Sequence, residues 1–377
     1  MIRIGITGQS GFIGTHLYNT LGLEPERFHR VLFGRSFFED SARLEQFVSQ
    51  CDVIVHLAAL NRHNDPQIIY DTNLNLVKRL ILAMELTHSK PHVLFASSTQ
   101  EERDNPYGRS KKEGRMLLEQ WAAQNRACFT GLIMPNVFGP FGHPYYNSVV
   151  STFCHQLTHN EQPKIDVDGE LKLIYVAELV QTIITHITNL QSTITNQQLP
   201  NTATIKVSRL LEKLTAFKQA YFDKHIIPRI QGPFDRNLFN TFVCYIDHKS
   251  FYPGKLVPRT DQRGNFVEVL KLDNTGGQVS FSTTVPGITR GNHFHIRKFE
   301  RFAVIKGNAR IDLRRIGTDE VLSFEMNGKK PSFVDMPIWF THNITNIGDD
   351  EVYTLFWISE FYDPDDGDTF FEEVTIR

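Results

Sequence analysis

Residues 1–14 read MIRIGITGQSGFIG, and this stretch decides the fold of the first part of the chain. Residues 2–7 alternate like a short buried strand, a glycine-rich turn follows, and residues 12–21 have the pattern of a helix. A strand, a glycine turn and a helix in this order can cradle a pyrophosphate, because glycines allow close approach and the helix N-terminus offers free amide donors. The stretch therefore predicts a dinucleotide site that includes Gly8, Gly11, Phe12, Ile13 and Gly14.

The next two predicted strands indicate which dinucleotide is bound. A second strand, predicted over residues 30–33, is followed by Gly34, Arg35 and Ser36, at the point where an acid would hold the ribose 2′-hydroxyl of NAD. An arginine suits a 2′-phosphate, so NADPH is favoured; the alternative is that Arg35 is only a solvated side chain. The third strand, DVIVHLAA over residues 52–59, ends in small alanines, and Ala58 allows close approach to the cofactor.

A second informative stretch, VLFASSTQEERDNPYGRSKKEG, spans residues 93–114. An apolar strand pattern ends at Ser98, and Pro106 opens a helical pattern in which Tyr107 and Lys111 share one face. A free phenol keeps its proton up to about pH 10, but an ammonium beside it is expected to lower the pKa of Tyr107 toward neutrality, which suits a general acid. With a hydrogen bond from Ser98, the trio could polarise a carbonyl and protonate its oxygen as hydride arrives.

Only the surroundings distinguish this pair from Tyr245 and Lys249, which repeat the spacing. Strand and helix patterns alternate up to Tyr107, as in a parallel doubly wound α/β sheet, whereas Tyr245 follows no cofactor fold. Together with Thr7, the glycine turn, the third strand, Ser98, Tyr107 and Lys111, this pattern resembles the extended short-chain dehydrogenase/reductases. The resemblance implies that Tyr107 transfers the proton, that Lys111 also holds the nicotinamide ribose, and that Ser98 fixes the carbonyl.

The segment PNVFGP, residues 135–140, resembles the loop of that family that leads into a sugar-nucleotide pocket. Asn136 is the expected substrate contact. Many members carry an arginine three positions earlier, where this chain has Ile133, so contacts to the substrate phosphates are expected from elsewhere. Amphipathic helices predicted over residues 149–160, 176–190 and 207–221 complete a reductase domain, which is assigned to residues 1–247.

Length and composition agree with two domains in a protein that needs neither a membrane nor a nucleic acid. The chain has 377 residues, 41% of them hydrophobic, and a formal charge of -2, which argues against nonspecific nucleic-acid binding. The four cysteines are widely spaced and predict neither a disulfide framework nor a cysteine metal site. No apolar run has the length of a signal core or a membrane span, so a cytoplasmic protein is expected.

After residue 247 the pattern changes. HKSFYPGKLVPRTDQRG, residues 248–264, is rich in proline, glycine and charge, and helical periodicity does not return. Short alternating segments take over, namely VEVLKL, QVSFSTTV, RFAVIKG, ARIDLRRI and VYTLFWIS. These predict an all-β domain over residues 248–377.

This second part contains a candidate metal site. His293 and His295 alternate onto one strand face, and Glu300 lies on the next segment. With PIWFTHNITN, which contains His342, they resemble the two motifs of the cupins, small β-barrels in which three histidines and a glutamate bind one divalent metal. Zinc suits this ligand set best, with iron, nickel or manganese as alternatives. The later sequence DPDDGD, residues 363–368, resembles a calcium loop only superficially and is expected to be a solvated turn.

A second resemblance overlaps the first. Residues Asp261, Arg263, Gly264, Phe266 and Glu268, followed by Arg290, Gly291 and His293, are similar to the 3,5-epimerases of deoxythymidine-diphosphate 4-keto-6-deoxyhexoses. The similarity implies that Arg263 and Arg290 bind substrate and that His293 is the catalytic base. Either His293 is a metal ligand and another group moves the proton, or it stays free and the metal site is incomplete. The ligand role is favoured because it accounts for His295 and Glu300.

The pairing of the two domains resembles the bifunctional CapF family of capsular polysaccharide enzymes. The resemblance implies a homodimer acting on a UDP-linked 2-acetamido-2,6-dideoxy-4-keto hexose, on the route to UDP-N-acetyl-L-fucosamine. In that interpretation the cupin domain epimerises carbon 3 and the reductase domain then reduces the ketone with NADPH. Two alternatives remain: a reductase whose cupin domain serves only dimerisation or substrate binding, and a nucleotide-sensing protein without turnover.

Overall fold

The computed structural model describes residues 1–189, 193–262 and 264–375. Contacts between residues divide the chain into two compact units, which are described separately. The first comprises Met1–Thr152 with Val167–Val207, and the second Phe153–Asp166 with Ser208–Arg377. In the described part of the chain, no helix combines the length and the apolar character needed to cross a membrane.

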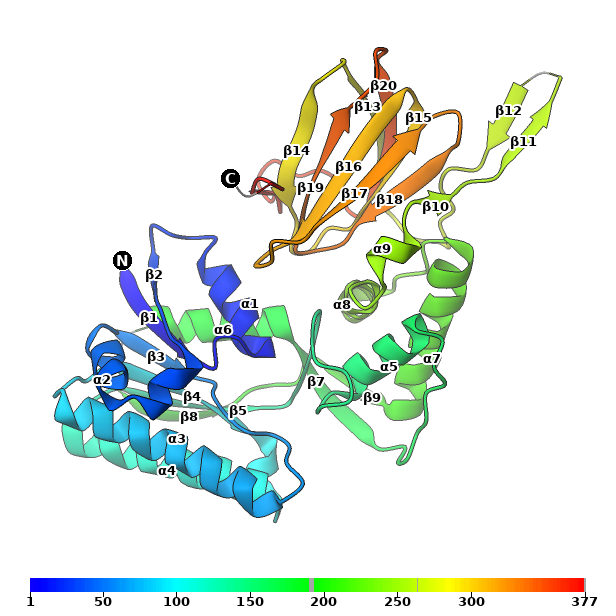
Figure 1. Ribbon diagram of the computed structural model, residues 1–377. Coiled ribbons are helices and arrows are strands. Elements are labelled where there is room, and N and C mark those ends of the chain that lie inside the picture. Colours follow the sequence, from blue (N-terminus) through cyan, green and yellow to red (C-terminus); the bar gives the residue numbers. More distant parts are fainter. Residues whose placement is uncertain (190–192, 263, 376–377) are drawn as a thin grey trace. The chain divides into compact units, whose positions relative to one another are not determined.

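The first unit is built around a parallel sheet of six described strands in the order β2-β1-β3-β4-β5-β8 (Figure 1). The chain runs from β1 to β2 on one side and then crosses to β3 on the other, so the strand order reverses between β1 and β3. Ligands of doubly wound sheets bind at the carboxyl ends of the strands at such a point. The strands are β1 Ile2–Thr7, β2 Phe28–Val31, β3 Val53–His56, β4 His92–Ser98, β5 Phe129–Met134 and β8 Ile194–Gln198.

Helices cover both faces of this sheet. Helices α1 (Phe12–Leu21) and α6 (Val176–Thr188) lie on one face, and α2 (Ser41–Ser49), α3 (Pro66–Leu86) and α4 (Pro106–Asn125) lie on the other (Figure 1). Sequence sets where these helices begin: α3 and α4 start at a proline and are capped by the side chains of Asp65 and Asn105. The core between the sheet and helices α2, α3 and α4 includes Phe47, Phe95, Trp121 and Phe129.

A smaller sheet, β6-β7-β9, extends the first unit beyond β5. Its strands are β6 Asn136–Phe138, β7 Glu170–Tyr175 and β9 Ala203–Lys206, and helix α5 (Val149–Thr158) follows β6 in the chain. The loop after β6 is tied to α1, since the buried ring of His16 contacts the carbonyl of Pro140 through Nε2 at 3.0 Å.

The second unit combines helices with two antiparallel sheets, β10-β18-β15-β20-β13 and β17-β16-β19-β14-β21 (Figure 1). The hairpin of β11 (Pro258–Asp261) and β12 (Gly264–Val267) projects from them. The helical elements are α7 Val207–Phe217, η3 Lys218–Phe222, α8 Gly232–Val243 and α9 His248–Phe251. The strands are β10 Gly254–Lys255, β13 Gln278–Thr284, β14 Thr289–Phe294, β15 Glu300–Lys306, β16 Asn308–Arg315, β17 Val321–Asn327, β18 Ser332–Met336, β19 Phe340–Asn346, β20 Val352–Ile358 and β21 Phe370–Phe371.

The predicted architecture of an α/β sheet followed by antiparallel sheets is confirmed, with no hydrogen-bonded closure of the two β-sheets into one barrel among the described residues. The predictions for β1 and α1 match residue for residue. The second strand lies two residues earlier than predicted, at Phe28–Val31. VEVLKL is not a strand: pairing stops at Val267, and a single bridge joins Leu272 to Ile227.

Helices α7 and α8 lie in the second unit by their contacts, whereas the sequence analysis grouped them with the reductase domain. Long-range hydrogen bonds join this segment to the β-sheets: the Tyr221 hydroxyl of η3 donates to Asp335 of β18 at 2.5 Å, and the side-chain amide of Asn240 in α8 donates to the carbonyl of Arg297 at 3.0 Å. The domain boundary at residue 247 therefore remains a prediction.

Candidate active site and candidate metal centre

The glycine turn after β1 is shaped so that only glycine fits at two positions. Gly8 has φ +74°, and a Cβ there would lie 2.8 Å from the backbone nitrogen of Ala58. A Cβ on Gly14 would lie 2.2 Å from the carbonyl oxygen of Gly8. The turn thus packs closely on the chain that leaves β3, and α1 begins directly after Gly11 with no side-chain cap on its amides. These residues fit the pyrophosphate of a dinucleotide.

Arg35 lies at the start of a short 3₁₀ helix, η1 (Arg35–Glu39), which follows β2. Its side chain is exposed. Because β2 neighbours β1 in the sheet, Arg35 belongs to the same edge as the glycine turn. Arg35 therefore lies at the edge of the sheet where doubly wound folds bind dinucleotides.

Ser98 ends β4 and caps the short helix η2 (Thr99–Glu102), and its hydroxyl accepts a hydrogen bond from the amide of Gln100 at 3.2 Å. Helix α4 approaches this turn closely, since a Cβ on Gly108 would lie 2.0 Å from the carbonyl oxygen of Gln100. Tyr107 lies in the first turn of α4. The glycine therefore lets the N-terminus of α4, with its tyrosine, pack against the strand end that carries Ser98.

Lys111 is buried one turn further along α4 and is 4% exposed. Its ammonium donates to the carbonyl of Ala96 at 2.8 Å and lies 5.8 Å from the centre of the Tyr107 ring. Burial lowers the pKa of Lys111 to about 8. Burial also raises the pKa of Tyr107 to about 12, with a smaller contribution from Tyr146. The predicted lowering of the Tyr107 pKa is therefore wrong for this structure, because burial raises that pKa and the Lys111 ammonium donates to the carbonyl of Ala96 and not to the phenol.

Polar contacts that the sequence analysis missed hold this arrangement. Glu101 of η2 pairs with Arg115 of α4 through contacts of 2.8 and 2.9 Å, and it also accepts the Ser97 hydroxyl. Asn73 of α3 donates to the hydroxyl of Ser110 at 3.0 Å, next to Lys111. No local pattern marks these residues, because their partners lie on other elements.

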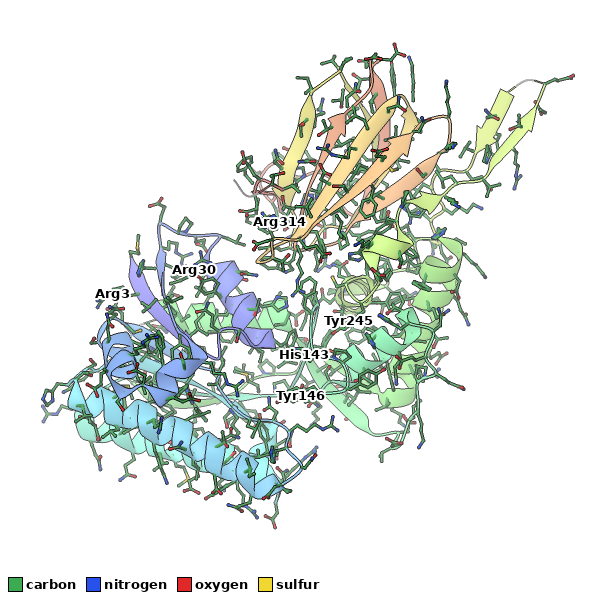
Figure 2. All side chains as sticks on the ribbon, in the orientation of Figure 1. Arg3, Arg30, His143, Tyr146, Tyr245 and Arg314 are labelled. Atoms are coloured by element: carbon green, nitrogen blue, oxygen red, sulfur yellow. The ribbon has the colours of Figure 1, made fainter. Side chains whose placement is uncertain are left out.

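Asn136, the predicted substrate contact, is exposed at the start of β6. Nearby loops of the first unit are tied together by Tyr146, labelled in Figure 2, whose hydroxyl accepts the amide of Asn61 at 3.3 Å. Tyr245, also labelled, follows α8, and Lys249 lies on α9. The repeated Tyr/Lys spacing thus does not place that pair on one helix.

In the second unit, four predicted ligands converge. His293, His295, Glu300 and His342 each offer one ligand atom, and these atoms lie within 4.8 Å of one another. A bulge in β14 between Gly291 and His293 brings His293 opposite His342 of β19. Glu300 comes from β15 in the other sheet. The cluster therefore lies where the two sheets of the second unit meet.

The hydrogen bonds around the cluster leave electron pairs facing its centre. The Nδ1 atoms of His295 and His342 lie 2.5 and 3.3 Å from the carbonyls of Asp368 and Phe340, and a carbonyl can only accept. Each neutral ring therefore presents its Nε2 lone pair to Glu300 Oε2, 3.2 Å away. Within the described residues these three buried atoms have no hydrogen-bond partner. A divalent cation fits such a donor set.

The ionisable groups of the cluster shift one another's pKa values. Burial lowers the pKa of His293 to about 4, and the neighbouring imidazoles of His342 and His295 lower it further. Although burial opposes it, the two imidazoles hold the pKa of Glu300 below its ordinary value. Although burial opposes it, Glu300 raises the pKa of His295, because a proton on that ring balances the carboxylate. Neutral imidazoles and a carboxylate are the forms that bind metal, so a cation would replace that proton.

Of the two arginines predicted to bind substrate, only Arg290 can be placed. It pairs with Ile344 across β14 and β19, and His342 lies two residues from Ile344 on the same face of β19. The Arg290 guanidinium donates to the carbonyl of Thr283 at 3.1 Å. Arg263 lies outside the described residues.

Two family models match the chain. Residues 4–199 match the NAD dependent epimerase/dehydratase family. Residues 259–370 match the polysaccharide biosynthesis C-terminal domain. The first match covers the parallel sheet with the glycine turn and Tyr107, and the second covers the His/Glu cluster.

Similar proteins cover both units. A UDP-2-acetamido-2,6-beta-L-arabino-hexul-4-ose reductase of Pseudomonas aeruginosa is 33% identical over 376 residues, 98% of each chain. The crystal structure of the capsular polysaccharide assembling protein CapF from Staphylococcus aureus shares 33% identity at a TM-score of 0.62, covering 98% of this chain and all of that one. A structure of CapF with the inhibitor 3-isopropenyl-tropolone shares 31% identity at a TM-score of 0.59, covering 99% of this chain and 100% of that one.

Proposed function

The chain belongs to the NAD dependent epimerase/dehydratase family and to its CapF-like sugar-nucleotide reductases, and from this premise we propose a bifunctional enzyme. Its substrate is a UDP-2-acetamido-2,6-dideoxy-4-keto hexose. The second unit inverts carbon 3, and the first unit then reduces the 4-ketone with NADPH to UDP-N-acetyl-6-deoxy-L-talosamine. This product leads toward UDP-N-acetyl-L-fucosamine for capsule or O-antigen.

The observation that carries the proposal is the position of Ser98, Tyr107 and Lys111 at the edge of the sheet that also holds the glycine turn. A bound NADPH supplies the hydride. Ser98 donates a hydrogen bond to the ketone oxygen, and Tyr107, whose pKa burial raises to about 12, gives that oxygen its proton. Lys111 holds the nicotinamide ribose with its ammonium. The carbon gains one hydride and the oxygen one proton, so the product is an alcohol.

The His/Glu cluster supports the epimerase half. A general base can take the proton from carbon 3 because the adjacent ketone takes the negative charge, and return of a proton to the opposite face inverts that carbon. A bound divalent cation, zinc by its ligands, would stabilise that charge. His293, His295, Glu300 and His342 would hold the cation, and Arg290, on the same face, would contact the substrate. Epimerisation must come first, since reduction removes the ketone that makes carbon 3 acidic.

The experiment is a reaction in deuterated water with NADPH and the UDP-linked 4-keto-6-deoxy N-acetylhexosamine, followed by NMR and mass spectrometry of the product. Oxidation of NADPH with stable deuterium at carbon 3 is the expected result. Oxidation without deuterium would reduce the second unit to a structural or binding role, and no oxidation would sink the substrate assignment.

Two variants separate the activities. Tyr107→Phe should abolish NADPH oxidation but leave deuterium exchange. Glu300→Gln should abolish deuterium exchange but still oxidise NADPH when the starting sugar already carries the product configuration at carbon 3. Tyr245→Phe is the matched control, since the same hydroxyl is removed at the repeated spacing. It should retain both activities.

Two other functions are distinguished by the same experiment. In the first, the chain is a reductase and the second unit serves dimerisation or substrate binding; the relative in Pseudomonas aeruginosa bears a reductase name only. In the second, the chain senses nucleotides without turnover. The intact Ser98, Tyr107 and Lys111 set favours an enzyme over the sensor.

A further inference from the structure

The C-terminal segment of residues 366–374 packs along the back of the His/Glu cluster. Its strand β21 pairs with β14 at the cluster, so that Phe371 lies opposite His293. Arg314 of β16, labelled in Figure 2, fixes the segment from the other side: its guanidinium donates to the carbonyls of Glu373 and Val374 at 2.7 and 2.8 Å. The segment is thus part of the wall that carries the cluster.

Asp368 is the residue of this segment that reaches the cluster itself. Its carboxylate accepts the three successive amides of Ile296, Arg297 and Lys298 at 3.2, 3.0 and 2.8 Å. Its own carbonyl lies 2.5 Å from Nδ1 of His295. The side chain was expected in a solvated turn, yet Asp368 is only 8% exposed. The expectation for the DPDDGD sequence is therefore wrong at this position, because the loop folds back onto the turn after β14.

We infer that Asp368 is a positioning residue of the metal centre, which acts through His295 and the turn between His295 and Glu300. The inference rests on the proposed metal-dependent function. Three amide hydrogen bonds fix a turn whose two ends carry ligands, so the distance between the ligands depends on this one carboxylate. The carbonyl of Asp368 keeps the proton of His295 on Nδ1 and leaves the Nε2 electron pair directed at the cluster.

The chemistry of the contact distinguishes an aspartate from its nearest isostere. A carboxylate has two acceptor oxygens and uses both for amide donors here. An asparagine would offer one oxygen and turn an NH₂ group toward a backbone N–H, which repels it. Asp368→Asn should therefore weaken the hydrogen bonds that hold the turn without creating a cavity. Loss of such supporting contacts typically reduces metal affinity about 10- to 100-fold.

Lys298 gives a second, milder perturbation. Its buried ammonium donates to the carbonyl of Gly367 at 2.9 Å and is 1% exposed. Lys298→Met keeps the length and the packing of the side chain but releases the residue next to Asp368. It should weaken metal binding in the same direction by a smaller factor, and it tests the inference even where Asp368→Asn folds poorly.

The test measures zinc affinity of the metal-free full-length protein by competition with a chelating indicator, and the absorption spectrum after cobalt(II) loading. Asp368→Asn should lose about 10- to 100-fold in affinity and change the cobalt spectrum, with circular dichroism unchanged. Asp365→Asn is the matched control, since this exposed carboxylate lies in the same loop, and it should bind as the unaltered protein does.

The outcomes separate this inference from the function on which it rests. If both Asp368→Asn and Lys298→Met bind zinc within about twofold of the unaltered protein and give its cobalt spectrum, Asp368 has no positioning role, since loss of a supporting contact should cost more. If the unaltered protein itself binds neither zinc nor cobalt, the metal-dependent function fails and the inference fails with it.

Discussion

Replacing Asp335 by asparagine should strongly destabilise the second unit, because it leaves a buried guanidinium without its counter-charge. Arg301 and Asp335 are 2% and 0% exposed and form two contacts of 2.7 and 2.8 Å. The Tyr221 hydroxyl donates to the same carboxylate, and Arg301 also donates to the carbonyl of His225 at 2.9 Å. The asparagine side chain would keep the shape of the site but not the charge.

Breaking a fully buried pair by removing one charge costs about 3–5 kcal/mol. For a unit of this size, each kcal/mol lowers Tm by roughly 2–4 °C, so Asp335→Asn should lower it by about 10 °C. An exposed pair behaves differently: Lys164 and Asp166 are 86% and 83% exposed, and Asp166→Asn should cost about 0–1 kcal/mol. The contrast between the two substitutions isolates the contribution of burial.

The assay is urea unfolding of the full chain, followed by circular dichroism and by tryptophan fluorescence, with Tm measured alongside. The double change Arg301→Met with Asp335→Leu should recover part of the loss, because it leaves no buried charge. A free-energy loss under about 1 kcal/mol for Asp335→Asn, the range of an exposed pair, would refute the reasoning. Tyr221→Phe should destabilise the same transition if the segment of α7 and α8 folds with the β-sheets, as its contacts indicate.

Three further predictions concern the candidate active site. Gly14→Ala should reduce NADPH affinity at least about 100-fold in fluorescence titration, because its Cβ would lie 2.2 Å from the Gly8 carbonyl oxygen, whereas Gly11→Ala, with 3.2 Å to the same atom, should lose far less. Because the pKa of Lys111 is about 8, its ammonium is lost as pH rises, and kcat/KM for reduction should fall about tenfold per pH unit above that value. Lys111→Arg should shift this alkaline decline of the pH profile to higher pH. If the decline does not shift, it reports the titration of another group. Arg35→Ala should lower the ratio of kcat/KM for NADPH to that for NADH about tenfold, while Arg35→Lys keeps most of it; an unchanged ratio in Arg35→Ala would mean that the side chain is only solvated.

Much of the fold follows from local patterns in the sequence. Some features depend only on residues close together in the chain, so they can be recognised without tertiary information. They are the glycine turn, the N-cap residue and proline at the start of α3 and α4, and the alternating pattern of the strands. The pair Tyr107 and Lys111 and the pair His293 and His295 belong to this class, because helix and strand periods place each pair on one face. The assignment of helices α7 and α8 to the second unit does not follow from local patterns, since an amphipathic helix could pack equally well against either unit.

By itself the sequence determined the order of the two folds, the dinucleotide turn and the residue types of both candidate sites. Only the tertiary structure decided which polar groups far apart in the chain pair with one another: Glu101 with Arg115, Tyr221 with Asp335, and Asp368 with His295. The last two pairs are separated by 114 and 73 positions in the chain. Such contacts leave no periodic signal, because a carboxylate in a loop has the same sequence appearance whether it faces water or three amides. Packing alone fixes that choice, since a buried charge is stable only where the fold brings its partners to it.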